Sequence, residues 1–169
     1  MGFFDKLFGG KAKDENTSKF TNQSKTILTP LQGKVLAQAD IPDETFAQGI
    51  LGPGCGIEPT GDTVYAPFDG TVTQIATTLH AVGMTSSEGT ELLIHVGMDT
   101  VDMKGQGFTV LVKEGQKVTA GTPLLKVDLD AIRAAGHPSA NEIIVTDGAD
   151  DVKMLAEGDV VPGTPLFKV

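Results

Sequence analysis

Internal repetition is the feature that most constrains the fold of this chain. The segments "TPLQGKVLAQ" (29–38) and "APFDGTVTQI" (66–75) share a Pro-apolar-x-Gly-x-Val pattern, in which a turn leads into an alternating strand. The segments "EGQKVTAGTPLLKV" (114–127) and "EGDVVPGTPLFKV" (157–169) repeat each other in the same way. Two copies of two hairpin-like units predict duplicated β-sheets that pack face to face. We therefore expect an all-β fold, a duplicated antiparallel β-sandwich with short helical turns.

The composition agrees with short strands separated by tight turns. The chain of 169 residues contains 21 Gly and 9 Pro but no Trp, and its length suits a single domain. Two short helical segments are predicted. One starts after Asp128 as N-cap and ends at Gly136, and one further turn of helix lies within residues 42–48.

The N-terminal part differs from the rest of the chain. Residues 1–10, "MGFFDKLFGG", place their large apolar side chains on one stripe if they are helical, which predicts a segment that lies on a membrane surface. A frayed tail is the alternative for so short a segment. Residues 11–26 have the polar composition of a flexible tether. We therefore divide the chain into an amphipathic segment with its tether, residues 1–26, and one folded domain, residues 27–169.

Charge and cysteine content restrict the partners and the compartment. Residues 1–26 contain five Lys and three acidic residues, a formal net charge of +2. Since the whole chain carries −9, residues 27–169 carry −11. An acidic domain repels phosphate backbones and attracts basic protein partners, which excludes nucleic acid as a ligand. A single Cys and an N-terminus without the apolar core of a secretory signal favour the cytoplasm.

Two of the three histidines, His80 and His95, flank the loop sequence "TSSEGT" (85–90). A hairpin that folds symmetrically about this loop pairs the two histidines directly across the strands, with Cβ atoms about 4.5–5.5 Å apart. Alternation along "ELLIHVG" (91–97) places His95 on the face opposite to the most continuous apolar stripe. We therefore expect the two imidazoles to meet at a partly apolar surface.

The residues beside this pair fit a site that uses neutral imidazoles. Gly97 is on the same face as His95 and is expected to leave room for its ring. Thr78 is on the same face as His80 and is expected to form a hydrogen bond with a ring nitrogen. Two neutral imidazoles are half of a zinc site, and they also suit a nucleophile beside a phosphate-stabilising donor. Spacing alone does not distinguish these two functions from a buried contact without chemical use.

The stretch "LLIHVGMDTVDMKGQGF" (92–108) resembles the signature of the glucose-type IIA components of the bacterial phosphoenolpyruvate-dependent sugar phosphotransferase system. That signature is an apolar run, His, apolar, Gly, apolar, Asp-Thr-Val and Lys-Gly-x-Gly-Phe. The segments "IPDETFAQGILGPGCGIEPTGDTVYAPFDGTV" (41–72) and "TTLHAV" (77–82) are similar to the family in order and spacing. The resemblance covers about residues 27–169 and implies a type 1 EIIA phosphocarrier domain.

The resemblance implies a role for each residue of the site. His95 would accept a phosphoryl group from phospho-HPr and pass it to a cysteine of the sugar-specific IIB domain, in the service of sugar uptake through IIB and IIC. His80 would stabilise the phosphoryl group, Thr78 would orient a ring, and Asp99 would hold the family's acidic position beside the site, with Gly97 in support. The residues expected to dock partners are Phe46, Ile50, Val82 and Val101.

The resemblance also bears on cofactors and on the membrane. Phosphocarrier chemistry of this kind requires no cofactor, and zinc can bind between His80 and His95 together with a carboxylate from a partner. The segment 1–10 is similar to one that is associated with membrane attachment in free-standing members. We therefore expect a cytoplasmic protein that contacts the inner face of the membrane at its periphery.

Two other classes of protein share parts of this pattern. A zinc peptidase of the lysostaphin type needs a His-x-His pair, which this sequence lacks, although "HVGMD" (95–99) supplies a His-x-x-x-Asp. A biotinyl or lipoyl carrier would use Lys104, since the repeats of "EGxxVxxGxPL" type resemble such domains. Gly105 and Gly107 instead predict that Lys104 lies in a turn that supports the site.

Overall fold

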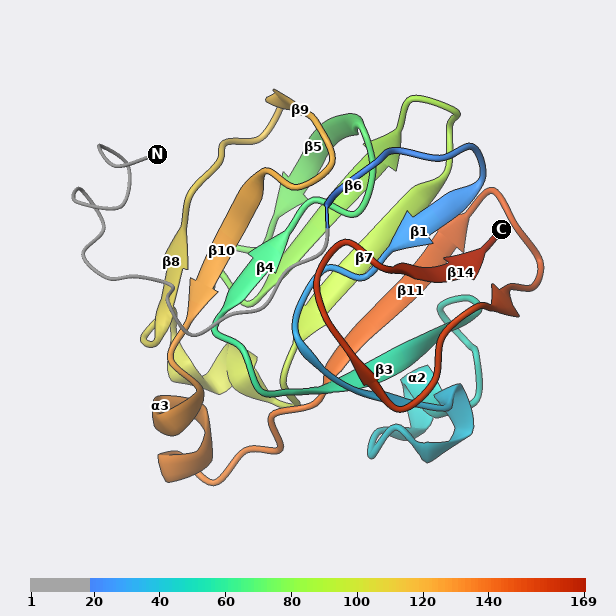
Figure 1. The fold of residues 1–169 in the computed structure, drawn as a ribbon. Helices are drawn as coiled ribbons and strands as arrows, with labels where there is room; N and C mark the ends of the chain where they lie inside the picture. Colours follow the sequence, from blue (N-terminus) through green and yellow to red (C-terminus); the bar gives the residue numbers. More distant parts are fainter. Residues whose placement is uncertain (1–18) are drawn as a thin grey trace.

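The computed structural model describes residues 19–169, and Figure 1 shows these residues as layered β-sheets with short helices at the edges. The large sheet has eight strands in the order β13-β2-β3-β11-β7-β6-β5-β9, and every pairing in it is antiparallel. Its strands are β2 (Gly33–Leu36), β3 (Gly54–Pro59), β5 (Gly70–Ile75), β6 (Ala81–Ser86), β7 (Glu91–Val96), β9 (Lys117–Val118), β11 (Asn141–Asp147) and β13 (Asp159–Val160).

Two three-stranded sheets complete the sandwich, in the orders β1-β14-β12 and β4-β10-β8. Figure 1 shows β1 and β14 beside one part of the large sheet and β4, β10 and β8 beside another. Their strands are β1 (Thr26–Leu28), β4 (Thr63–Tyr65), β8 (Phe108–Val110), β10 (Pro123–Val127), β12 (Lys153–Met154) and β14 (Pro165–Lys168). The predicted all-β sandwich is therefore confirmed.

The sequence repeats occupy equivalent places in the sheets. The segments 29–38 and 66–75 supply β2 and β5, and the segments 114–127 and 157–169 supply β9 with β10 and β13 with β14. In the large sheet β13 pairs with β2 at one end, and β9 pairs with β5 at the other end. The strand order thus shows two related halves that meet between β11 and β7, which agrees with the expected duplication, although both halves belong to one sheet.

Side chains from all three sheets form the main core. It contains Ile94 of β7, Ile143 of β11, Leu125 of β10 and Phe167 of β14, each almost inaccessible to solvent. Burial of large apolar side chains contributes about 1.5–3 kcal/mol each, so this shared core holds the sheets together. Ile41, Phe46, Met98 and Ile144 form a second, smaller buried cluster.

The helices are short and begin at side-chain caps. In α2 (Glu44–Ala47) the Asp43 side chain accepts hydrogen bonds from the next helical N–H groups, and in α3 (Leu129–Ala134) Asp128 caps Ala131. Gly136 follows α3 with a φ of +85°, as expected of a residue that ends a helix. Both predicted helical segments are confirmed. Two 3-10 helices, η1 (Gln38–Asp40) and η2 (Thr100–Met103), complete the elements.

The last residues of the expected tether belong to the folded unit. Thr26 is the first residue of β1. Phe20 packs against Tyr65 with ring centroids 5.6 Å apart, and Asn22 accepts a hydrogen bond from the backbone of Asp69. The domain therefore includes residues from Phe20 onward, which corrects the boundary at residue 27. The amphipathic segment, residues 1–10, lies outside the described residues.

Candidate functional site

His95 lies near the end of β7, on the face of the large sheet that points away from the main core. Leu92, Ile94 and Val96 belong to the main core, whereas Leu93 packs against the second cluster. The side chain of His95 is 18% exposed, and its ring contacts that of Phe46 with centroids 5.0 Å apart. The predicted facing of His95 is therefore confirmed. The short helix α2 covers one side of the imidazole.

His80 reaches His95 from outside the strand. The residue opposite His95 in the ladder is Ala81, so the predicted register is wrong by one residue. His80 directly precedes β6 and follows Leu79, whose φ of +66° turns the chain in a left-handed conformation. The two rings nevertheless meet, with centroids 4.8 Å apart and planes at 85°. The left-handed turn at Leu79 and the hydrogen bond from the N–H of Val96 to the His80 carbonyl together bring the imidazoles side by side.

Thr78 fixes one nitrogen of His80. Its hydroxyl Oγ1 lies 2.7 Å from Nδ1 of His80, so the predicted hydrogen bond is present. A hydroxyl can donate to Nδ1 or accept from it, and either arrangement restricts rotation of the ring. The contact leaves Nε2 of His80 as the nitrogen that is open to a ligand.

Glu142 fixes the corresponding nitrogen of His95. It lies opposite His95 in the pairing of β11 with β7, and its Oε1 is 2.8 Å from Nδ1 of His95. The carboxyl group is fully buried, and Oε2 forms no hydrogen bond with any residue that the structure describes. Glu142 was not among the residues predicted for the site. The signal available was a charged residue directly before the apolar strand "IIV" (143–145), where a buried position usually excludes charge.

Burial keeps the groups of this site uncharged. The pKa of His95 is lowered to about 4, mainly by burial and secondly by the charge of His80, while a hydrogen bond with the Gly97 backbone acts in the opposite direction. Burial also lowers the pKa of His80. The pKa of Glu142 is raised to about 10 by burial and by the nearby carboxylates of Asp43 and Glu58. The contact of Glu142 with His95 is therefore a hydrogen bond between neutral groups near pH 7, and not an ion pair.

Gly97 is required for a different reason from the one expected. Its φ is +75°, and a Cβ atom at this position would lie 2.5 Å from the side chain of Thr100. The constraint comes from the backbone conformation and from buried Thr100, and not from crowding of the imidazole. Asp99 follows two residues later as N-cap of η2, is exposed, and its charge raises the pKa of His95.

The expected docking residues separate into two groups. Ile50 and Val101 are exposed, at 67% and 49%, and exposed Leu51 follows Ile50. Phe46 is mostly buried and packs on His95. Val82 is buried in the main core, so its prediction as a docking residue is wrong, because the shift of register turns it inward.

The two imidazoles supply only part of a metal site. Their hydrogen bonds engage Nδ1 of each ring, and both Nε2 atoms suit zinc as ligands. Among residues 19–169 no group of three or more His, Cys, Asp or Glu side chains could hold a metal ion. A zinc ion would therefore need a third ligand from another molecule.

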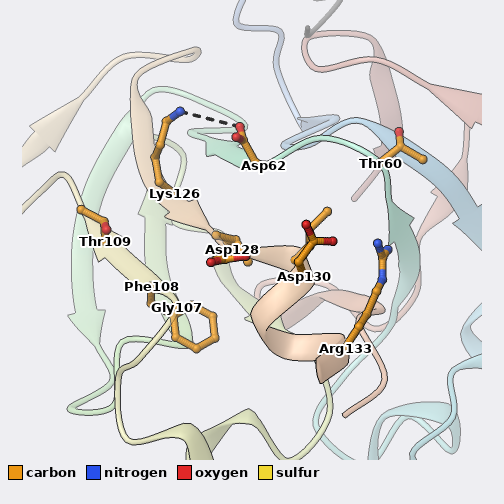
Figure 2. A pocket seen from close by; sticks show the side chains of 11 residues that line it. Thr60, Asp62, Gly107, Phe108, Thr109, Lys126, Asp128, Asp130 and Arg133 are labelled. Carbon is orange, nitrogen blue, oxygen red and sulfur yellow. Dashed lines mark ion pairs between the residues drawn. The ribbon is translucent and has the colours of Figure 1, made fainter. Parts of the chain in front are cut away.

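A separate open pocket lies beside α3, and Figure 2 shows it close up. Arg133 and Asp130 of α3 line it together with Lys126. Nζ of Lys126 lies 3.8 Å from Oδ1 of Asp62. Neither His80 nor His95 lines this pocket. Its acidic and basic side chains are mixed, and no histidine or cysteine lines it.

The surroundings of Lys104 do not suit a swinging-arm carrier. Lys104 follows η2 and has a φ of +55°, and Gly105 and Gly107 also have positive φ values. The predicted turn is therefore confirmed, and Lys104 does not stand at the tip of a hairpin. No helix within residues 19–169 has the length and hydrophobicity needed to cross a bilayer.

Comparison with known proteins agrees with this geometry. Residues 25–151 match the family described as "phosphoenolpyruvate-dependent sugar phosphotransferase system, EIIA 1". The chain is 43% identical over 146 residues to the "PTS system glucose-specific EIIA component" of Halalkalibacterium halodurans, covering 85% of this chain and 83% of that protein. It resembles the solved structure titled "glucose permease IIA from Mycoplasma capricolum" with a TM-score of 0.80 and 30% identity, covering 89% of this chain and 98% of that one.

Other relatives contain this domain within a longer chain. The "PTS system glucose-specific EIICBA component" of Streptococcus pneumoniae is 39% identical over 157 residues, or 92% of this chain, but the match spans only 22% of that protein's length. Its name joins EIIA to EIIB and EIIC in one polypeptide. These matches do not favour a zinc peptidase or a biotinyl or lipoyl carrier. The extent of the family match and the identity to a free-standing EIIA component show that the chain belongs to the type 1 EIIA family of the phosphoenolpyruvate-dependent sugar phosphotransferase system.

Proposed function

We propose that Nε2 of His95 accepts a phosphoryl group from phospho-HPr and passes it to a cysteine of a sugar-specific IIB domain. The observation that carries this proposal is the pair of rings with their Nδ1 atoms engaged by Thr78 and Glu142. Since Nδ1 of His95 is occupied, Nε2 is the nitrogen available for attack. The low pKa of His95 keeps its ring unprotonated near pH 7, as a nucleophile requires.

The transfer conserves atoms and electrons without a cofactor. The lone pair on Nε2 of His95 forms the new N–P bond while the N–P bond of the donor histidine breaks and returns its electron pair to the donor ring. In the second transfer a cysteine thiolate attacks phosphorus, and the N–P bond to His95 breaks. A loose transition state needs mainly positioning and charge stabilisation, which two fixed rings on a sheet can provide.

The neighbours of His95 have supporting roles in this proposal. His80 donates from Nε2 to the phosphoryl oxygens, and Thr78 holds its ring in the required orientation. The exposed apolar residues Ile50, Leu51 and Val101 dock the partner proteins, because exposed apolar side chains near a site commonly anchor protein interfaces. Asp99 and Gly97 shape the turn that follows His95.

Two further expectations stay proposals. Zinc would bind Nε2 of both histidines when a partner supplies the third ligand, and the phosphoryl transfer does not depend on it. The segment 1–10 would hold the cytoplasmic protein at an anionic membrane surface, where membrane-bound acceptors lie. Co-sedimentation with anionic vesicles, compared for the full chain and for a chain that lacks residues 1–10, tests the second expectation.

Intact-mass spectrometry after incubation with phosphoenolpyruvate, enzyme I and HPr tests the proposed function. Wild type should gain one acid-labile phosphoryl group, and His95→Ala should gain none. His80→Gln should accept the group but pass it on slowly. His137→Ala, which removes the third histidine from a loop after α3, is the matched control and should behave as wild type. A wild-type protein without a phosphoryl group would contradict the proposal.

A further inference from the structure

Glu142 is an unusual residue for its position. It lies on β11 between β7 and β3, and Ile143 and Ile144 follow it with no exposed surface. One carboxyl oxygen contacts Nδ1 of His95, and the other has no hydrogen-bond partner among the described residues. A buried polar atom without a partner costs about 1–3 kcal/mol. Packing alone therefore does not account for a carboxyl group here, since an apolar side chain would avoid this cost.

The hydrogen bond at Nδ1 decides which nitrogen of His95 is nucleophilic. If Nδ1 carries the proton and donates it to Oε1, Nε2 keeps its lone pair. If the carboxyl group donates to Nδ1, the ring proton lies on Nε2 and blocks attack there. Oε1 can accept from Nδ1–H whether or not the carboxyl group is ionised, whereas donation to Nδ1 needs a proton on Oε1 itself. The contact therefore favours the first arrangement.

We propose that Glu142 is a positioning residue for phosphoryl transfer: it accepts the Nδ1–H of His95 and so holds the ring in the tautomer with a free Nε2. This inference rests on the function proposed above. When the Nε2 lone pair bonds to phosphorus, the ring gains positive charge that is shared with Nδ1–H. Oε1 at 2.8 Å stabilises this charge, and the proton remains on Nδ1 throughout the transfer.

Three variants separate this role from packing. Glu142→Leu keeps a side chain of similar volume without an acceptor. Glu142→Gln keeps both the size and an acceptor oxygen. Asn141→Leu is the matched control, because Asn141 is the preceding residue, is equally buried, and hydrogen-bonds Ser139 instead of a histidine. Thermal unfolding should show Glu142→Leu folded and close to wild type in stability, because it removes the unpartnered Oε2 while Nδ1 of His95 loses its partner.

Nitrogen-15 NMR of the histidine rings and phosphoryl transfer kinetics form the test. In wild type at neutral pH, His95 should carry its proton on Nδ1. Glu142→Leu should populate the Nε2–H tautomer and accept the phosphoryl group about 10- to 100-fold more slowly, the loss expected for a hydrogen bond to a charged group. Asn141→Leu should match wild type in both readouts. Across the variants, the rate should follow the fraction of the Nδ1–H tautomer.

Two results would overturn the inference: a wild-type ring with its proton on Nε2, or a Glu142→Leu protein with the wild-type tautomer and rate. Failure of the proposed function is distinct, because wild type would then accept no phosphoryl group at all. In that case the ring tautomers of wild type and Glu142→Leu still decide whether Glu142 controls His95.

Discussion

The rings of His80 and His95 meet edge to face with centroids 4.8 Å apart, while Ala81 occupies the position opposite His95 in the ladder. His80 is thus held by a turn and by Thr78, whereas His95 is held within a strand that pairs on both sides. The two histidines therefore have different supports. The carbonyl of His80 also accepts a hydrogen bond from the N–H of Val96, so the turn 76–80 is tied to the end of β7.

Loss of the Thr78 hydroxyl should weaken the contribution of His80. In Thr78→Val the shape is kept but Nδ1 of His80 loses its partner at 2.7 Å. We expect the passage of the phosphoryl group to the acceptor to slow about 5- to 10-fold, because one hydrogen bond contributes roughly 1 kcal/mol. Single-turnover transfer measures this effect. Exposed Thr77 offers the control Thr77→Val, and equal rates for the two variants would contradict the role of Thr78.

An alanine at Gly97 should destabilise the domain more than an alanine at another glycine of positive φ. Gly89 has a φ of +93° and nothing within 4 Å of an added Cβ. Gly89→Ala should therefore lower the free energy of unfolding only by the backbone cost of about 1–2 kcal/mol. Gly97→Ala adds a contact of 2.5 Å with Thr100, for which overpacking costs about 1–3 kcal/mol more. Urea unfolding of the two variants gives the difference in free energy of unfolding. Equal values would show that Thr100 moves aside freely.

The stability conferred by position 142 should depend on pH. The folded carboxyl group of Glu142 keeps its proton up to a pKa of about 10, whereas in the unfolded chain it loses the proton above its ordinary pKa of 4.5. The folded state therefore binds more protons across this range, and wild type loses stability relative to Glu142→Gln as pH rises, by up to about 1.4 kcal/mol per pH unit.

Unfolding in urea at pH 5, 6.5 and 8 measures this difference between wild type and Glu142→Gln. The lowered pKa of His95 acts in the opposite direction, since it removes stability as pH falls from 6.5 toward 4, and it is present in both proteins. A difference that stays constant with pH would show that Glu142 is ionised in the folded state.

A charge at Ile50 should impair recognition of partners but not folding. Ile50 is 67% exposed, so Ile50→Glu should change the free energy of unfolding by less than about 0.5 kcal/mol. We expect the KM for the phosphoryl donor protein to rise about tenfold, because apolar anchors commonly contribute more than 1 kcal/mol to an interface. Exposed Met154 on β12 offers the matched control Met154→Glu. Equal donor kinetics in both variants would remove Ile50 from the interface.

The repeats and the alternation of apolar residues were sufficient to predict the sandwich and the facing of His95. Strand register was not predictable to one residue, because the hairpin is centred on Glu88, with three loop residues between Ser86 and Thr90, and not between Ser87 and Glu88 as expected. The buried state of Val82 follows directly from that register. The wrong assignment of Val82 and the wrong pairing of His80 therefore have one common cause.

Glu142 could not be placed from sequence for a different reason. It lies 47 positions from His95, and only the return of the chain through β11 brings the two together. A charged residue directly before an apolar strand is equally typical of a strand end that is exposed to solvent. Burial of such a group becomes visible only when the neighbouring strands β3 and β7 are both in place.

The position of β11 has a mechanical consequence for phosphoryl exchange. Because β11 is joined on one side to β7 and on the other to β3, moving the backbone of Glu142 away from the imidazole would require breaking ladder hydrogen bonds on both flanks. The residue that contacts Nδ1 of His95 therefore belongs to a strand that is paired on both sides. Under the proposed function, donor and acceptor proteins of different shapes would then have to fit one fixed nitrogen, and the adjustment between successive partners would come from the partners themselves.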